Sequence, residues 1–285
     1  MSRSKLLRLA ICAVSAVLIS HPLQAASFDR LYVFGDSYSD NGAGYIDGNG
    51  PTAVAYLAQR LGFQLKPATS AEAQGESLNF AVSGAGTGNG QGAKRGENAF
   101  LGLGMGRQVD DFANRVRSGQ IKFKPDTTLF FLAGGLNDRR IPTDETVSNL
   151  KGEIRVLYSL GARRFMLALL PTAIPNFSEV GKRLNPALEL IPRAMMAELA
   201  EAKIHLSRWG VFFDAIMQNP EQYGIRNTTA ACAGRAIFQQ DTTPCPAPGT
   251  YFYYHEGHPS TAVHKAVGEK LYLEVRTFEK EVSGQ

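Results

Sequence analysis

The sequence has few of the side chains that bind metals or carry out redox chemistry. It contains three cysteines and five histidines among 285 residues, and no Cys-x-x-Cys pair. Zinc sites and thioredoxin-like redox sites need clustered cysteine and histidine ligands or that dicysteine motif. The sequence therefore supports neither kind of site, and we expect no metal.

The sequence also lacks a concentration of positive charge. Thirty Lys and Arg residues against 26 Asp and Glu residues leave a formal net charge of +4, and the basic residues are scattered along the chain. Proteins that bind nucleic acid usually carry a basic cluster or stripe. The sequence pI near 8.9 is therefore weak evidence for such a partner, and we expect none.

The apolar stretch near the N-terminus is too short for a typical membrane anchor. It runs from Leu9 to Ile19, whereas a helix that spans a bilayer needs roughly 20 apolar residues. A basic segment precedes it, and the small residues Ala25 and Ala26 follow it, which is the pattern of a secretory signal peptide. We interpret residues 1–26 as that signal, with a membrane anchor as the alternative, and expect a secreted or periplasmic protein without stable membrane insertion after the signal is removed.

The cysteine distribution agrees with export. Cys12 would leave with the signal, so Cys232 and Cys245 would remain as an even pair that closes a short loop in an oxidising compartment. We expect them to form a disulfide, and two free thiols are the alternative.

The remaining chain, residues 27–285, shows neither an internal repeat nor a domain linker, and its 44% hydrophobic content can bury the core of one domain. Short apolar runs predict five buried strands: Leu31–Phe34, Leu78–Val82, Thr128–Ala133, Phe165–Leu170 and Val211–Ile216. Helical patterns lie between and after them: Thr52–Leu61, Gly106–Val116, Glu145–Leu160, Ala194–Arg208 and Ser260–Thr277. Such alternation predicts an α/β domain with a mainly parallel sheet and helices on both faces.

Polar and small residues follow three of these strands, where an open parallel sheet gathers its chemistry. The segments are Gly35–Ser37, Ser83–Gly86 and Gly134–Asp138, and a fourth, His255–Pro259, precedes the last helix. A serine hydroxyl becomes a good nucleophile when an imidazole takes its proton, so we assign Ser37 as the nucleophile and His258 as the base.

The same segments offer donors for the oxyanion of a tetrahedral intermediate. We expect the backbone N–H groups of Ser37 and Gly84 and the side-chain amide of Asn137 to form the oxyanion hole. Gly84 suits this role because it has no side chain to block the substrate. His205 and His264 fall inside helical patterns and are interpreted as surface or packing residues.

These motifs resemble the four blocks of the GDSL, or SGNH, lipases and acylhydrolases. The blocks occur in the family's order as GDS at Gly35–Ser37, the glycine at Gly84, G-x-N-D at Gly135–Asp138 and HP at His258–Pro259. The chain looks like the secreted bacterial branch that contains lecithinase- and haemolysin-like lipolytic enzymes. The resemblance implies a three-layer, flavodoxin-like α/β/α sandwich, an ester-hydrolysing Ser–His site and no cofactor.

The sequence departs from the family at one position. Family members usually carry an aspartate three residues before the histidine, where this chain has His255, and Glu256 is the only carboxylate in that block. A Ser37–His258 dyad, with a backbone carbonyl or a water holding the imidazole, could still work. His255 or Glu256 is a possible third member or orienting residue, Glu256 only if the local turn differs.

The glycine-rich segment from Gly84 to Gly106 invites a different interpretation. Its opening GAGTGNG follows a predicted strand, as a dinucleotide-binding loop would, but the spacing is not G-x-G-x-x-G and no helix begins within the motif. We expect a mobile loop at the border of a substrate cleft, in which Phe100, Leu101, Leu103 and Met105 contact an acyl chain or pack on the sheet.

Three other functions use the same residues and remain open. An acyltransferase would discharge the same acyl-enzyme to an alcohol, an acetyl-carbohydrate esterase would need the same catalytic edge, and a binding protein could retain the fold without activity. We favour a serine ester hydrolase acting on lipid-like or aliphatic acyl esters. The oligomeric state is left open.

Overall fold

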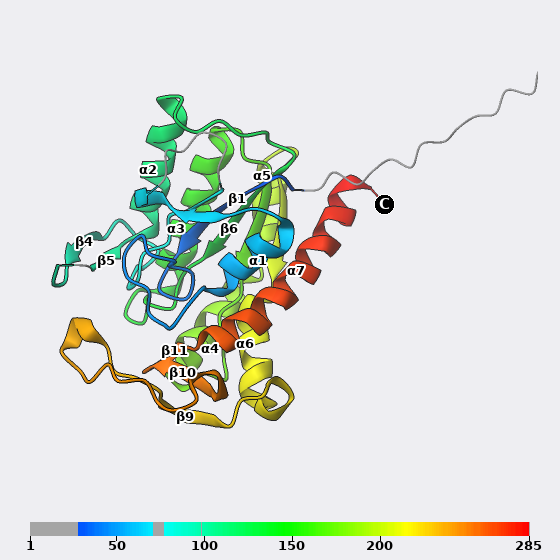
Figure 1. The fold of residues 1–285 in the computed structure, drawn as a ribbon. Helices are drawn as coiled ribbons and strands as arrows, with labels where there is room; N and C mark the ends of the chain where they lie inside the picture. Colours follow the sequence, from blue (N-terminus) through cyan, green and yellow to red (C-terminus); the bar gives the residue numbers. More distant parts are fainter. Residues whose placement is uncertain (1–27, 71–76, 98, 285) are drawn as a thin grey trace, which may run out of the picture.

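The computed structural model describes residues 28–70, 77–97 and 99–284 (Figure 1). The expected signal peptide, residues 1–26, lies outside this range and stays a prediction. No helix within the described ranges is both long enough and apolar enough to cross a bilayer.

Six strands of the described residues form the central sheet. In spatial order they are β2 (Leu65–Pro67), β3 (Ser77–Asn79), β1 (Arg30–Gly35), β6 (Thr128–Ala133), β7 (Arg164–Ala168) and β8 (Lys203–Ser207). Every neighbouring pair in the sheet is parallel. The carboxyl ends of β1, β3 and β6 therefore meet at one edge, as the expected α/β fold requires.

Helices cover both faces of this sheet (Figure 1). One group contains α1 (Ala53–Leu61), α6 (Trp209–Gln218) and α7 (Thr261–Ser283). The other contains α2 (Met105–Arg117), α3 (Thr143–Ser159), α4 (Pro175–Leu188) and α5 (Ile191–Glu198). The prediction of a mainly parallel sheet between two helical layers is confirmed.

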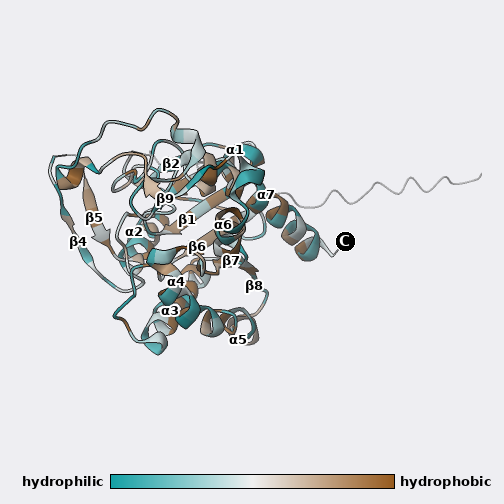
Figure 2. Cartoon of the chain, turned by 90° about the horizontal axis from the view of Figure 1, so that it is seen from below, coloured by the Kyte–Doolittle hydropathy of each residue, from teal (hydrophilic) through white to brown (hydrophobic). Residues whose placement is uncertain are grey.

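The hydrophobic core lies between the layers. All six residues of β6 are buried, as are five of the six residues of β1, and the strands at the centre of the view in Figure 2 are largely apolar. Strands covered on both faces have no solvent side, so their sequences are continuous apolar runs rather than alternating patterns. This is why these two strands could be recognised from the sequence.

Two smaller sheets lie beside the carboxyl edge. An antiparallel hairpin is formed by β4 (Gln91–Lys94) and β5 (Phe100–Leu103), and a second sheet by β9 (Asn227–Ala231), β10 (Tyr251–His255) and β11 (His258–Pro259). Short 3₁₀ turns occur at Ala68–Ser70, Pro220–Tyr223, Ala236–Phe238 and Pro248–Thr250. Residues in or beside these two small sheets border the candidate site described below.

Two of the predicted elements are wrong. The run at Val211–Ile216 belongs to helix α6, and the predicted helix Ala194–Arg208 divides into the end of α5 and strand β8. A short, continuously apolar run fits a buried helix as well as a buried strand, and β8 is an edge strand with little apolar sequence. In addition, α4 occupies the segment that follows β7, where the sequence suggested no helix.

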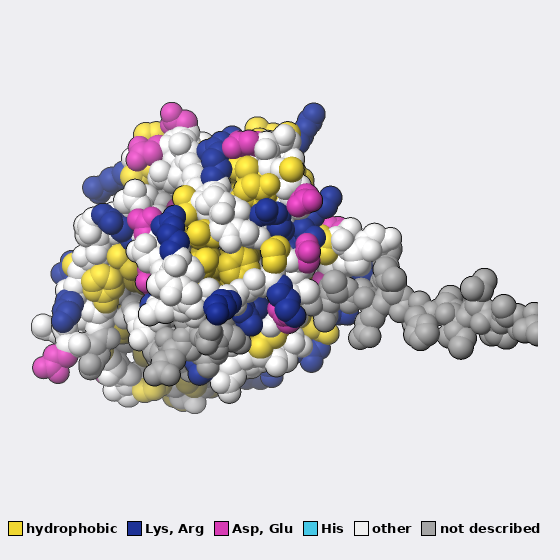
Figure 3. Space-filling model, turned by 90° about the horizontal axis from the view of Figure 1, so that it is seen from above, with side chains coloured by type: hydrophobic (Ala, Val, Ile, Leu, Met, Phe, Trp, Pro, Cys, Tyr) yellow, Lys and Arg dark blue, Asp and Glu magenta, His cyan; other side chains and the backbone are white. Residues whose placement is uncertain are grey.

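Charged side chains are mixed on the surface. On the face seen in Figure 3, Lys and Arg are spread among acidic, polar and apolar side chains. This distribution agrees with the scattered charge of the sequence.

Candidate active site

The turn after β1 is shaped by Gly35 and Asp36. A Cβ at Gly35 would lie 2.6 Å from the carbonyl oxygen of Ala133 on β6, so only glycine fits there. The buried carboxylate of Asp36 accepts a hydrogen bond from the N–H of Tyr38 at 3.1 Å, and its carbonyl accepts from the N–H of Ser39 at 3.0 Å. These contacts close the turn around Ser37, which therefore stands at the carboxyl end of β1.

The structure brings Ser37 and His258 together across 221 residues of sequence. Ser37 Oγ lies 2.9 Å from Nε2 of His258, and Nδ1 of the same ring lies 2.9 Å from the backbone carbonyl oxygen of Glu256. A carbonyl oxygen can only accept, so Nδ1 carries the proton and the Nε2 lone pair faces the serine hydroxyl. This is the tautomer that a general base needs.

The environment of His258 keeps its ring neutral. Burial lowers the pKa of His258 to about 3, and the Arg235 guanidinium acts in the same direction. The hydroxyl of Tyr38 donates to the carbonyl of Gly257 at 2.8 Å, which ties the nucleophile turn to the segment that carries the imidazole. The ring is therefore unprotonated at neutral pH and has a defined place beside Ser37.

The residues of the three expected oxyanion donors, Ser37, Gly84 and Asn137, border one cleft. Gly84 has a φ of +79°, which favours glycine, and neither its N–H nor that of Ser37 has an acceptor within the described ranges. Asn137 donates one amide N–H to the carbonyl of Ala85 at 2.9 Å, which fixes the side chain and leaves the second N–H available.

Asp40 organises the loop behind the nucleophile, a role that the sequence did not reveal. Its buried carboxylate accepts hydrogen bonds from the backbone N–H groups of Gly42, Ala43, Gly44, Tyr45 and Ser83. One carboxylate thus fixes both the loop that follows Ser37 and the residue before Gly84. Aspartate in a glycine-rich stretch is ordinary turn sequence, so no local signal distinguished it.

The position that departs from the family pattern, His255, is buried and contacts a carboxylate. Its Nδ1 lies 2.8 Å from Oδ1 of Asp47, and burial lowers the pKa of His255 to about 4. Asp47 also forms an ion pair with Arg235, in which Nε lies 2.9 Å from Oδ1 and Nη2 contacts Oδ2. The sequence did not single out Asp47, because Asp47-Gly48 is a common turn dipeptide.

Glu256 takes part through its backbone. Its side chain is exposed and borders the cleft, and the contact with His258 Nδ1 is made by the carbonyl oxygen. Of the arrangements considered from the sequence, the geometry matches a backbone carbonyl that holds the imidazole.

The cleft above Ser37 has a volume of about 600 Å³. Apolar side chains border it from three segments: Leu101 on β5, Phe177 on α4 and Phe238 on the loop between Cys232 and Cys245. Polar side chains also border it, namely Asn137, Arg139, Asn176, Arg235, Gln240 and Glu256. Of the apolar residues noted in the glycine-rich segment, Leu101 borders the cleft, whereas Met105 is fully buried at the start of α2.

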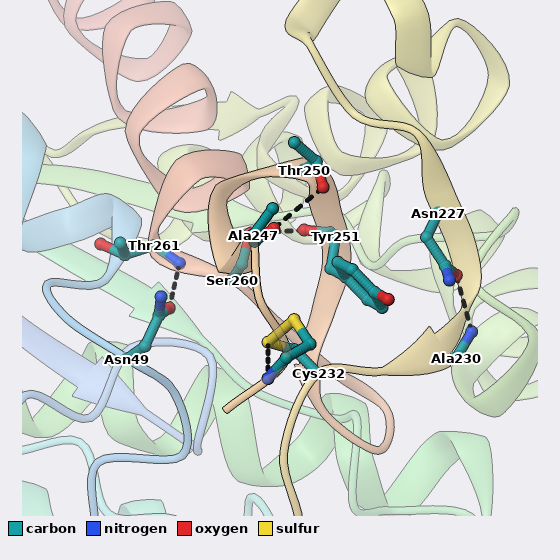
Figure 4. Close-up of a disulfide and its surroundings, with 10 residues drawn as sticks. Asn49, Asn227, Ala230, Cys232, Ala247, Thr250, Tyr251, Ser260 and Thr261 are labelled. Carbon is teal, nitrogen blue, oxygen red and sulfur yellow. Dashed lines mark hydrogen bonds between the residues drawn. A yellow bond between two sulfur atoms is a disulfide. The ribbon is translucent and has the colours of Figure 1, made fainter. Parts of the chain in front are cut away.

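A disulfide joins Cys232 and Cys245, which confirms that prediction. It lies beside β10 and the start of α7, where Ser260 donates to the carbonyl of Tyr251 at 2.7 Å and the N–H of Thr261 donates to Asn49 at 2.8 Å (Figure 4). The loop that the disulfide closes carries Arg235, Phe238 and Gln240 into the cleft.

The other two histidines of the described residues, His205 and His264, lie outside the cleft. His264 on α7 is buried, and its Nδ1 accepts the N–H of Ala53 at 3.2 Å, so it packs as expected. His205 lies on β8 instead of a helix, with Nε2 3.5 Å from Glu274. Within the described ranges, no group of three or more His, Cys, Asp or Glu side chains is arranged to hold a metal ion.

The chain is similar to known lipolytic proteins. Residues 31–271 match the model of the family described as GDSL-like Lipase/Acylhydrolase. A thermolabile hemolysin of Vibrio parahaemolyticus is 29% identical over 220 residues, which cover 68% of this chain and 50% of the hemolysin. A GDSL esterase/lipase of Arabidopsis thaliana is 26% identical over 317 residues, which cover 85% of this chain and 86% of that protein.

Among solved structures, the psychrotrophic esterase EstA from Pseudoalteromonas sp. has a TM-score of 0.47 at 13% identity, covering 88% of this chain and 98% of EstA. The family match extends over most of the chain and includes all four sequence blocks. The chain therefore belongs to the GDSL lipase/acylhydrolase family and is a carboxylic ester hydrolase.

Proposed function

We propose that this protein is an exported serine esterase that cleaves lipid-like or aliphatic acyl esters through an acyl-enzyme on Ser37. The observation that carries the proposal is the 2.9 Å contact between Ser37 Oγ and His258 Nε2, with Nδ1 held by the Glu256 carbonyl. Residues 27–285 would form the catalytic domain, and no cofactor takes part in the proposed reaction.

The first half-reaction forms the acyl-enzyme. Ser37 Oγ attacks the ester carbonyl carbon while its proton passes to Nε2 of His258. The carbonyl oxygen becomes an oxyanion, which accepts hydrogen bonds from the N–H groups of Ser37 and Gly84 and from the Asn137 amide. The bond to the alcohol then breaks, and the alcohol leaves with the proton from His258.

The second half-reaction releases the acid. A water molecule gives a proton to His258 Nε2 as its oxygen attacks the acyl carbon, and a second oxyanion forms in the same hole. Collapse of this intermediate breaks the bond to Ser37 Oγ, which takes back the proton from the imidazolium. The products are a carboxylic acid and an alcohol.

The walls of the cleft support an acyl-ester substrate. Leu101, Phe177 and Phe238 offer apolar surface, with Phe238 about half exposed at 51%. Apolar surface beside a few polar groups is typical of sites that bind small apolar ligands. Export is supported by the expected signal and by the disulfide, because disulfides persist in oxidising compartments.

The test compares p-nitrophenyl ester hydrolysis by the mature protein and by Ser37→Ala. We expect the variant to lose at least about 10³-fold in kcat, because the nucleophile is absent. Ser39→Ala is the matched control, since Ser39 lies two residues away and its buried hydroxyl has no hydrogen-bond partner within the described ranges. Equal rates in wild type and Ser37→Ala would remove Ser37 from the mechanism.

The substrate class is tested with esters that differ only in acyl length, from acetyl to palmitoyl. We expect activity to extend beyond acetyl esters, because the apolar walls can contact longer chains. Activity confined to acetyl groups on carbohydrate would refute the lipid-like class. Transfer of the acyl group to added glycerol or sterol in preference to water would identify an acyltransferase.

A further inference from the structure

Asp47 is a buried carboxylate next to His258, and the proposed steps do not use it. Its side chain is fully inaccessible to solvent. It contacts groups from two other segments of the chain, Arg235 on the disulfide-closed loop and His255 at the end of β10. Burying an unpaired charge costs free energy, so the Asp47 carboxylate needs these partners to offset the loss of water.

The partners of Asp47 fix its orientation. An ionised carboxylate can only accept, so Nδ1 of His255 carries the hydrogen that it donates to Oδ1 at 2.8 Å. The Arg235 guanidinium contacts both carboxylate oxygens. A bidentate guanidinium pair is directional as well as strong.

This orientation brings the second carboxylate oxygen close to the proposed base. Oδ2 of Asp47 lies 3.3 Å from Nε2 of His258, the same nitrogen that faces Ser37 Oγ. In the resting state Nε2 carries a lone pair and no proton, so a neighbouring anion does not stabilise it. When it takes the proton from Ser37, the ring becomes a cation and the carboxylate attracts it, so the interaction strengthens as the reaction proceeds.

The position of Asp47 also accounts for the unusual residue at 255. The family pattern has an aspartate there, whereas here His255 holds a carboxylate supplied by a loop 208 residues earlier. The imidazole is still oriented, because the Glu256 carbonyl holds Nδ1. Asp47 thus supplies the negative charge that the family's aspartate would provide, but from the Nε2 side of the His258 ring.

We infer that Asp47 is a positioning residue of the proposed reaction: held by His255 and Arg235, its carboxylate stabilises the imidazolium form of His258. The inference rests on the proposed function of Ser37 and His258. Arg235 has two opposing effects, because it anchors Asp47 but its positive charge disfavours the imidazolium.

The experiment measures kcat and KM for wild type, Asp47→Asn, Arg235→Gln and the double variant. We expect Asp47→Asn to lower kcat on the order of 10- to 100-fold with KM nearly unchanged, because the shape is retained and the charge is lost. The double variant should remain slower than wild type, because the carboxylate that stabilises the imidazolium is still missing. Asp241→Asn on the same disulfide loop is the control, because its exposed carboxylate contacts Thr243 and no residue of the site.

The double variant separates catalysis from simple charge pairing. If Asp47 served only to neutralise Arg235, removing both charges would restore wild-type kcat, and that result would overturn the inference. If Asp47→Asn does not fold, Arg235→Gln still decides. In this variant His255 still holds Asp47 and the positive charge that disfavours the imidazolium is gone, so kcat should stay at or above the wild-type value. A tenfold lower kcat in folded Arg235→Gln, with KM unchanged, would contradict the inference.

Ser37→Ala, measured in the same assay, separates this inference from the proposed function. Full activity in Ser37→Ala would refute the proposed function, and the inference with it. An inactive Ser37→Ala beside an Asp47→Asn variant of wild-type kcat would refute the role of Asp47 alone. Thermal unfolding of each variant shows which of them are folded at the assay temperature.

Discussion

Removal of the disulfide tests how the candidate site is held together. The change is Cys232→Ser with Cys245→Ser, which opens a loop with a sequence separation of 13 residues. In the chain-entropy treatment, closing a loop of this length stabilises the folded state by about 3 kcal/mol. Unfolding entropy grows with chain length, so for a protein of this size the loss corresponds to a fall of about 6 °C in Tm.

The loop also has a functional connection. Backbone hydrogen bonds run from Cys232 to Tyr253 at 3.2 Å and from Ala233 to Tyr254 at 2.9 Å, next to the strand end that carries His255. The same loop presents Arg235 to Asp47. A freely moving loop would weaken these hydrogen bonds and hold His255 less firmly beside Asp47, so we expect kcat to fall in the double-serine variant even at temperatures where it is fully folded.

The assay combines thermal unfolding by circular dichroism with ester hydrolysis at a temperature well below both transitions. Wild type in a reducing agent is the matched comparison and should approach the Tm of the double-serine variant. An unchanged Tm in both samples would contradict stabilisation by loop closure, because it would mean that the loop is equally restricted in the unfolded chain or that the thiols are not joined. A lower Tm with unchanged kcat would contradict only the functional connection.

Three further predictions concern single side chains. Asn137→Ala should lower kcat about 10²- to 10³-fold with little change in Tm, because it removes one oxyanion donor; a kcat within twofold of wild type would exclude the amide from the oxyanion hole. Glu256→Gln should leave kcat within about twofold of wild type, since the backbone carbonyl holds His258, and a collapse of activity would identify the side-chain carboxylate as the third member. Burial lowers the pKa of His264 to about 3, which is below the pKa of histidine in the unfolded chain. Protonation therefore favours the unfolded state, and the folded state loses stability as the pH falls below about 6.5. Relative to His264→Asn, which keeps an acceptor for the N–H of Ala53, wild type should therefore lose about 2 kcal/mol between pH 8 and pH 5 in denaturant titrations; parallel pH dependence of the two proteins would show that His264 is not neutralised by burial.

The features that depend on neighbouring residues could be predicted from the sequence alone. The apolar runs of β1 and β6 predicted buried strands, because a strand covered on both faces must be apolar throughout. The turn at Gly35–Ser37 and the segments around Gly84 and Asn137 were recognisable because chemistry gathers after the ends of parallel strands. The order of these blocks was enough to identify the family and to single out Ser37 and His258.

The groups that surround the imidazole could not be predicted in this way, because they come from segments that meet only in the folded chain. Asp47 contacts Arg235 across 188 residues and His255 across 208 residues, and no local pattern separates this aspartate from one in an ordinary turn. Likewise, Val211–Ile216 is a helix because α6 is buried against α7, a contact that periodicity along the sequence does not reveal. Local sequence specifies turns and apolar faces, whereas the pairing of buried charges depends on how distant segments pack, because burial and proximity arise only in the folded chain.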